Sequence, residues 1–489
     1  MEPIIINNKQ VNQAMFQFVF PFQIKKGQES KLINILKTQE FEHFRLDQLE
    51  NENKYYGNYR VSHLELEQYY LPFTNKILFP HTEDEKGFQR FSKIFSRLYN
   101  LISCDIQIPF FIHSIDITVC PYHLGLLTIR TEIPGNIELS EAIEFASRFR
   151  ILDKKTTKKE TKVFIDHTES SFNDVETFIF DYLCPDLKQF FNRQNKNDAY
   201  FEALPFFEDE KMYVQSLIRV ESDGKFDSID AYRIVNLDGL NLKGESFVSS
   251  NNFNFIERFI QDNSYDRWAP NTLYVMQEHC FSCITNENEE VFSQLASQYY
   301  GKYYYAFILN MFHKNVLLKL ANDYSEIDVE KDNDKIEKLI HSINSFTANY
   351  FFLELAAQSQ SRQIFVQLRK MFLIENLYQD ARDTLMTLYK YDEKFSEQKS
   401  NFLLLILTLY TVVGGIYGMN QVIEDLKGDI DWSKMLSYSL FEYMALFITI
   451  SGLITAIYLA VHNFIKWRHD KRKREKWSAE TSIYQKKIK

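Results

Sequence analysis

The sequence predicts an α/β domain that is followed by a long helical stalk and by two C-terminal transmembrane helices. Three observations lead to this fold class. Aromatic and β-branched runs, punctuated by Pro, Gly or Asn, alternate with helix-like segments over residues 1–300. No Gly or Pro then occurs between Gly301 and Gly414. Two long apolar blocks without charged residues follow near the C-terminus.

The charge of the chain is uneven. The 489 residues include 56 Lys and Arg against 66 Asp and Glu, which gives a formal net charge of −10. Residues 466–489 run against this trend, because they hold ten basic and three acidic residues. A nucleic-acid-binding protein would carry its basic surface on the large domain, and here the large domain is acidic. Nucleic acid is therefore not expected as a partner, whereas an acidic domain suits a protein that meets cations.

Residues 1–300 are expected to form a cytoplasmic α/β domain. The first residues lack the basic start and the apolar core of a secretory signal, so this part is expected to stay where it is made. Strands are predicted over Met15–Ile24, Met212–Val220 and Tyr232–Leu237, with more than one within Phe110–Ile133. Helices are predicted over Phe88–Ile102 and Ser140–Phe149.

Residues 301–399 are expected to form a helical stalk. Apolar residues recur there at spacings of three and four: Leu339, Ile343, Phe346, Tyr350 and Leu353. This period is typical of a coiled coil or of one long packed helix. An antiparallel helical hairpin that packs on itself is the alternative. In both cases a long helix is expected to continue into the first apolar block.

The two apolar blocks predict membrane spans at residues 400–423 and 441–465. Charged residues are absent from 400–423 and from 443–465, and each block exceeds the ~20 residues that cross a bilayer. By the positive-inside rule, the basic segment 466–489 is a cytoplasmic tail. Residues 424–440 then form an extracellular loop. Both termini are expected in the cytoplasm of a multi-pass protein of the cell membrane.

The first apolar block ends in Tyr417-Gly418-Met419-Asn420. A YGMN sequence at the outer end of the first of two C-terminal spans resembles the signature of the CorA family of magnesium transporters. The resemblance covers the membrane part and the overall plan, and it has no specific match in residues 1–300. It implies a homopentameric channel that carries divalent cations, Mg²⁺ in the first place, down the membrane potential.

The resemblance also implies the roles of the motif residues. Gly418, Met419 and Asn420 are expected to form the selectivity filter, and Tyr417 is expected to support the motif. Mg²⁺ surrenders its water reluctantly, so a ring of Asn420 amide oxygens would bind the cation through its hydration water. The family has a hydroxyl residue nine positions before its Asn, and this chain has Thr411 there.

One face of the first block is expected to line a pore. Leu404, Thr408, Thr411 and Gly415 lie at spacings of three and four, which places them on the same side of a helix. Two hydroxyls and a glycine on one stripe of an apolar helix are typical of a pore face. The alternative is that small residues only let helices pack closely.

The loop after the motif is acidic. Its acidic residues are Glu424, Asp425, Asp429 and Asp431, and they would concentrate cations at the mouth of a pore. The loop has no Pro, whereas many family members follow the tripeptide with Met-Pro-Glu. Zinc-transporting relatives share the tripeptide, so transport of zinc, cobalt or nickel is an alternative. A membrane-anchored sensor or binding protein without transport is another.

No feature predicts an enzyme. The chain lacks a Walker loop, a GxSxG and an HExxH sequence, and no cofactor is expected besides the transported cation. Cys280 and Cys283, preceded by His279, form a single CxxC pair. Buried thiols are the favoured interpretation, with half a zinc site or a redox pair as alternatives. The expected partners are other copies of the chain, lipid and divalent cations.

Overall fold

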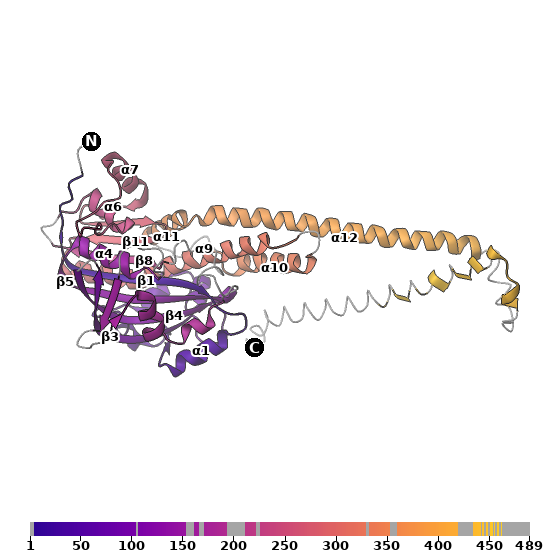
Figure 1. Cartoon of the computed structure of the whole chain (residues 1–489), viewed down its shortest axis with the longest axis horizontal. Helices are drawn as coiled ribbons and strands as arrows, with labels where there is room; N and C mark the ends of the chain where they lie inside the picture. The colour runs from indigo at the N-terminus through magenta and orange to yellow at the C-terminus, as the bar shows by residue number, and fades with distance from the viewer. Residues whose placement is uncertain are drawn as a thin grey trace. The chain divides into compact units, whose positions relative to one another are not determined.

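The protein was analysed as a computed structural model, which places most of the chain (Figure 1). The structure describes residues 4–103, 106–152, 161–165, 171–192, 211–221, 225–328, 332–352, 359–418, 434–441, 443–444, 446–447, 450–452, 454, 457–458 and 461. The chain divides into two units. The first consists of Met1–Asp328 and Lys338–Leu385, and the second of Val329–Glu337 and Met386–Lys489.

A large mixed β-sheet organises the first unit. Among the described residues it has eleven strands in the order β7-β6-β3-β4-β5-β1-β8-β11-β10-β9, with β2 paired to β3. The strands are β1 (Gln10–Gln23), β2 (Glu42–His43), β3 (Gln89–Ser103), β4 (Ile106–Cys120), β5 (Leu124–Glu138), β6 (Thr161–Ile165), β7 (Ser171–Phe172), β8 (Tyr213–Val220), β9 (Ser264–Tyr265), β10 (Thr272–Gln277) and β11 (Cys280–Thr285). Neighbours are antiparallel except for the parallel pair β8 and β11.

Helices connect the strands and continue after them. The α-helices are α1 (Glu29–Thr38), α2 (His63–Tyr69), α3 (Pro72–Leu78), α4 (Leu139–Phe149), α5 (Val175–Thr177), α6 (Ser228–Asn236), α7 (Phe253–Asn263), α8 (Glu289–Gln298), α9 (Tyr304–Ser325), α10 (Asn333–Asn349), α11 (Ser359–Met371) and α12 (Ile374–Gly418). A π-helical turn, η7 (Tyr299–Tyr303), joins α8 to α9.

One face of the sheet packs on α4 through aromatic rings. Side chains alternate between the two faces along a strand, so Phe16 and Phe18 of β1 point the same way. Phe16 contacts Phe145 with ring centroids 5.5 Å apart, and Phe18 contacts Phe149 at 4.7 Å. Each of these rings is buried, and burial of one Phe stabilises the fold by about 1.5–3 kcal/mol.

The opposite face of the sheet is covered by η7 and α9. Met15 and Gln17, the alternate residues of β1, point to this side and are also buried. The Tyr300 hydroxyl contacts Met15 Sδ at 3.5 Å, and Gln17 Nε2 donates to the Tyr299 carbonyl oxygen at 3.3 Å. The central strands are thus buried on both faces, between a layer with α4 and a layer with η7 and α9.

The longest helix, α12, has 45 residues and a length of about 68 Å at 1.5 Å per residue. It begins after Leu373, whose positive φ of 55° separates it from α11. Arg369 of α11 secures the junction. Its Nε donates to Glu375 Oε1 (2.8 Å), and its Nη1 donates to the Phe352 carbonyl oxygen (2.7 Å). The start of α12 is therefore attached to the first unit.

The two predicted transmembrane helices, 400–423 and 441–465, are not borne out. Within the described part of the chain, none of the helices combines the length and the apolar character needed to cross a membrane. In α12, charged residues extend as far as Lys399, and polar residues and glycines interrupt the apolar residues after it. The fold-class prediction is therefore wrong at its C-terminal end. The predictions of a transmembrane transporter and of a multi-pass protein of the cell membrane are wrong with it.

Candidate functional site

The residues predicted to line a pore lie on α12 in the second unit. Leu404, Thr408, Thr411 and Gly415 are helical and exposed. The Thr408 hydroxyl donates a hydrogen bond to the Leu404 carbonyl oxygen (2.7 Å), and the Thr411 hydroxyl donates to that of Leu407 (2.7 Å). Each hydroxyl hydrogen is used within the helix. The oxygen lone pairs then remain available to bind a cation or to accept a hydrogen bond from its water.

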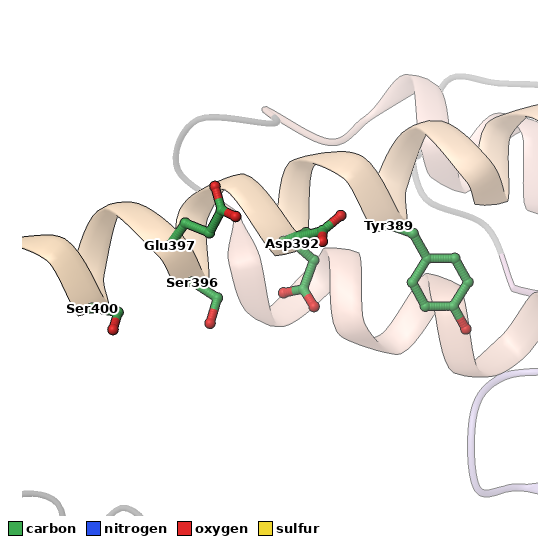
Figure 2. A pocket seen from close by; sticks show the side chains of 6 residues that line it. Tyr389, Asp392, Ser396, Glu397 and Ser400 are labelled. Carbon is green, nitrogen blue, oxygen red and sulfur yellow. The ribbon is translucent and has the colours of Figure 1, made fainter.

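A shallow pocket continues this face toward the N-terminus of α12. It is lined by Tyr389, Asp392, Glu393, Ser396, Glu397 and Ser400. Figure 2 shows Tyr389, Ser396 and Ser400 extending from the same side of the helix. We call the residues Tyr389, Asp392, Ser396, Ser400, Leu404, Thr408, Thr411 and Gly415 the α12 stripe, because each follows the last at a spacing of three or four.

Sequence reasoning began this face at Leu404 and missed Tyr389, Asp392 and Ser396 at its N-terminal end, of which Asp392 is the acidic residue. The signal was present in the sequence. The spacing of three and four that links Leu404 to Gly415 also runs backward through Ser400 and Ser396 to Asp392. A carboxylate end and a hydroxyl end therefore share one face of one helix.

Large apolar side chains surround the C-terminal half of α12. Leu405, Leu407 and Leu409 are 61–65% exposed, and Val412 is more than half exposed. Because residues two apart on a helix point in different directions, these side chains do not belong to one narrow stripe. An exposed apolar surface of this kind is typical of regions where proteins bind other molecules.

A close contact in the second unit covers part of this helix. A Cβ atom added to Gly452 would lie 2.8 Å from Cδ1 of Tyr410, so the absence of a side chain lets the two segments approach. By contrast, a Cβ atom added to Gly414 or Gly415 would meet nothing within 4 Å. Within the part of the chain that the structure describes, the side of α12 that carries Gly415 is thus open.

The motif itself is described only in part. Tyr417 and Gly418 continue the backbone of α12 to its end, and their side-chain surroundings are not described. Met419 and Asn420 lie outside the described residues. So do the loop acids Glu424, Asp425, Asp429 and Asp431. Among the described residues, no group of three or more His, Cys, Asp or Glu side chains is placed to hold a metal ion.

The CxxC pair lies inside the sheet. Cys280 and Cys283 are buried in β11, and their odd spacing places them on opposite faces of the strand. Burial raises the pKa of Cys280 to about 11 and the pKa of Cys283 further, so both remain thiols at neutral pH. Burial also lowers the pKa of His279 to about 3. The two cysteines are therefore part of the core, and His279 is half-buried beside them.

A buried charged cluster lies on the face of the sheet under η7 and α9. It consists of Arg90 on β3, Asp116 on β4 and Arg130 on β5, each no more than 3% exposed. Asp116 Oδ2 is 2.9 Å from Arg90 Nε and 2.5 Å from Arg130 Nη1. Sequence reasoning missed this cluster, whose only local signal is a charged residue inside an apolar strand.

Tyrosine side chains enclose the cluster. Arg90 Nη1 donates to the hydroxyl of Tyr305 (2.7 Å) and to that of Tyr56 (3.3 Å). The Arg130 guanidinium lies 4.9 Å from the ring centroid of Tyr304, close enough for a cation–π interaction. The cluster therefore ties β3, β4 and β5 to the start of α9.

Comparison with known proteins gives no relative. No family model matches the sequence, and neither a curated protein nor a solved structure matches the chain. The resemblance to the CorA family accordingly depends on Tyr417–Asn420 and on the residues that precede them on α12.

Proposed function

We propose that this protein binds divalent metal cations along α12 and does so as a homo-oligomer, with Mg²⁺ as the preferred ion. The observation that carries the proposal is the α12 stripe, where oxygen-bearing side chains recur from Asp392 to Thr411 on a helix that ends at the GMN tripeptide. Mg²⁺ prefers oxygen ligands and keeps much of its water. The stripe offers oxygen atoms and no nitrogen or sulfur ligand, which favours Mg²⁺ over zinc.

The two ends of the α12 stripe suit two steps of cation binding. The carboxylate of Asp392 attracts a divalent cation over a distance of about one Debye length, ~8 Å at physiological salt. The hydroxyl oxygens of Thr408 and Thr411 accept hydrogen bonds from the water shell of the cation without adding charge. By the resemblance, the amide oxygen of Asn420 would do the same at the end of the helix.

Self-assembly follows from the shape of a single helix. One helix presents the α12 stripe on one side only, so several copies are needed to surround a hydrated ion with side-chain oxygen atoms. The exposed apolar side chains beside the stripe, such as Leu405 and Leu409, would be covered where copies meet. Five copies are implied by the resemblance alone.

The test is calorimetric titration of the purified full chain with Mg²⁺, Zn²⁺, Co²⁺ and Ni²⁺. Light scattering measures the mass of the assembly that the chain forms in solution. We expect an assembly of several chains and tighter binding of Mg²⁺ than of the other ions. Asp392→Asn, Thr411→Val and Asn420→Ala should each weaken Mg²⁺ binding by about tenfold or more, or about 1.4 kcal/mol.

Glu257→Gln on α7 is the matched control, because it removes one exposed carboxylate away from α12. It should leave Mg²⁺ binding unchanged. Equal weakening by Glu257→Gln and Asp392→Asn would reduce the effect to net charge and would contradict the site. A monomeric chain with full Mg²⁺ affinity would contradict the self-assembly.

A further inference from the structure

The buried cluster of Arg90, Asp116 and Arg130 does not balance its charge. Two guanidinium groups face one carboxylate, and Asp116 is fully buried between them. Arginine stays protonated in proteins. Burial works against a charged guanidinium, but Asp116 together with Tyr304 and Tyr56 offsets this, and the pKa of Arg130 is raised. One positive charge is therefore left over in a place without solvent.

The surrounding side chains do not supply the missing negative charge. Burial raises the pKa of Tyr304 to about 12 and also raises that of Tyr305, so both phenols are neutral at physiological pH. The next carboxylate along β5 is Glu132, which accepts hydrogen bonds from His113 (2.7 Å) and Gln13 (2.5 Å). Neither of these hydrogen bonds joins Glu132 to the cluster.

One donor of the cluster has no partner. Arg130 Nε donates to Gln17 Oε1 (2.9 Å), and Arg130 Nη1 donates to Ser114 Oγ (3.2 Å). Arg130 Nη2 is fully buried and has no hydrogen-bond partner among the described residues. Buried donors in proteins are almost always paired, and a charged donor without a partner is especially costly. Among the described residues nothing satisfies this donor, and a bound group would do so.

We propose that a small inorganic monoanion of about the size of chloride binds in this layer of the first unit, against Arg130 Nη2. A single negative charge cancels the excess charge of the cluster. Tyr305 and Tyr56 accept from Arg90 Nη1, so their own hydroxyl hydrogens are available to donate to an anion. The rings of Phe44, Tyr56 and Tyr304 pack around the two guanidinium groups, which separates the cluster from bulk solvent.

The anion would hold α9 to the sheet. Tyr304 and Tyr305 come from the start of α9, whereas Arg90 and Arg130 come from β3 and β5. An anion that binds the folded chain and not the unfolded chain stabilises the folded chain by mass action. Above the dissociation constant, this stabilisation grows with the logarithm of the anion concentration. The covering turn η7 is π-helical, a form that occurs mainly as single turns and frequently at functional sites.

The test uses crystals of the full chain grown in bromide, and thermal unfolding in sodium chloride, bromide or gluconate at equal ionic strength. We expect an anomalous bromide peak within hydrogen-bonding distance of Arg130 Nη2. We also expect a Tm that rises with chloride or bromide and does not rise with gluconate, which is too large to enter. An ordered water at Nη2 with no anomalous peak, or bromide peaks on the surface only, would overturn the proposal.

Arg130→Met removes both the excess charge and the unpaired donor while it leaves Arg90 paired with Asp116. Its Tm should no longer depend on the identity of the anion. Arg258→Met on α7, which removes an exposed guanidinium, should keep the anion dependence of the unchanged chain. The same loss in both variants would show a general salt effect and contradict the site. If Arg130→Met does not fold, the bromide peak and the Tm series of the unchanged chain still decide.

Discussion

Phe351 lies flat on Tyr378, with ring centroids 3.9 Å apart and an angle of 10° between the ring planes. Tyr378 belongs to the second turn of α12, and Phe351 follows the end of α10. Arg369 completes the contact, because its guanidinium lies 4.7 Å from the Phe351 ring centroid. A ring pair and an ion pair thus hold the first turns of α12.

Tyr378→Ala should release the first turns of α12 from the first unit. The change removes an aromatic pair whose geometry adds about 0.5–1.5 kcal/mol to the area that it buries. Hydrogen exchange of the amides of residues 374–385 should become faster, while amides of β1 keep their rates. Tyr378→Phe keeps the ring and should behave like the unchanged chain. Fast exchange in both variants would show that the hydroxyl, rather than the stack, holds the helix.

Gly57→Ala should destabilise the first unit for two reasons. Gly57 has a φ of +64°, which other residues adopt at a cost of about 1–2 kcal/mol. An added Cβ would also lie 2.7 Å from Cε1 of His113. We expect the free energy of unfolding in urea to fall by about 2 kcal/mol or more. Gly244→Ala isolates the first effect, because Gly244 has a φ of +80° and open space around it, and it should cost about half as much.

Asp230 should make the folded chain less stable as the pH rises. Burial, with a smaller contribution from Asp227, raises the pKa of Asp230 to about 6. The folded state then holds this proton at pH values where the unfolded state, with a pKa of about 3.9, has lost it. The proton on Asp230 therefore stabilises the folded state fully below pH 4, and this stabilisation is lost as the pH rises to about 6.

Asp230→Asn should remove this pH dependence. An Asn oxygen can still accept the hydrogen bond from the Asp227 amide, so the start of α6 is kept. The variant should be more stable than the unchanged chain by about 1–3 kcal/mol at pH 7.5 and nearly equal to it at pH 4. Urea unfolding at the two pH values measures the difference. The same gain at both values would contradict the raised pKa.

Two glycines of the second unit should respond differently to Ala. Gly452→Ala would bring a Cβ to 2.8 Å from the Tyr410 ring, and Gly415→Ala would meet nothing within 4 Å. Gly452→Ala should therefore speed hydrogen exchange along the C-terminal half of α12 in the isolated chain. Gly415→Ala should not do so, but it should weaken Mg²⁺ binding and assembly, since Gly415 is part of the α12 stripe. Unchanged binding would remove Gly415 from the site.

Several elements of the sheet were predictable because their local pattern agrees with their place in the fold. The strands predicted at Met15–Ile24 and Met212–Val220 correspond to β1 and β8, and the helix predicted at Ser140–Phe149 corresponds to α4. The segment Phe88–Ile102 was predicted as a helix and is strand β3. Its register shifts between Ile94 and Arg97. This bulge changes the phase of the alternation and leaves apolar residues at helix-like spacings.

The segment Tyr232–Leu237 was predicted as a strand and is the end of α6. Its β-branched residues favour a strand, but Asp227 and Asp230 form a capping box that starts a helix. Leu237 ends this helix in the left-handed conformation, with a φ of 58°. Here the capping residues outweigh the intrinsic preference of the residues that follow.

The two candidate sites also differ in how far the sequence predicts them. The placement of Leu404, Thr408, Thr411 and Gly415 on one helix was predictable from their spacing, and their role stays a prediction. The cluster of Arg90, Asp116 and Arg130 was not predictable, because three strands bring it together from positions that show no common pattern. The two predicted spans were inferred from the absence of charge over each block, and the described helices do not support them.

The position of β1 in the sheet has a consequence for synthesis of the chain on the ribosome. This strand leaves the exit tunnel before β8, yet one of its edges pairs with β8, where Val11 meets Val220. At roughly 5–20 residues per second, the roughly 200 residues between these partners take about 10–40 s to translate. During that interval a long aromatic strand keeps one edge open to other nascent chains. Chaperone demand should therefore be highest just before residue 213 is translated and should fall once β8 has emerged.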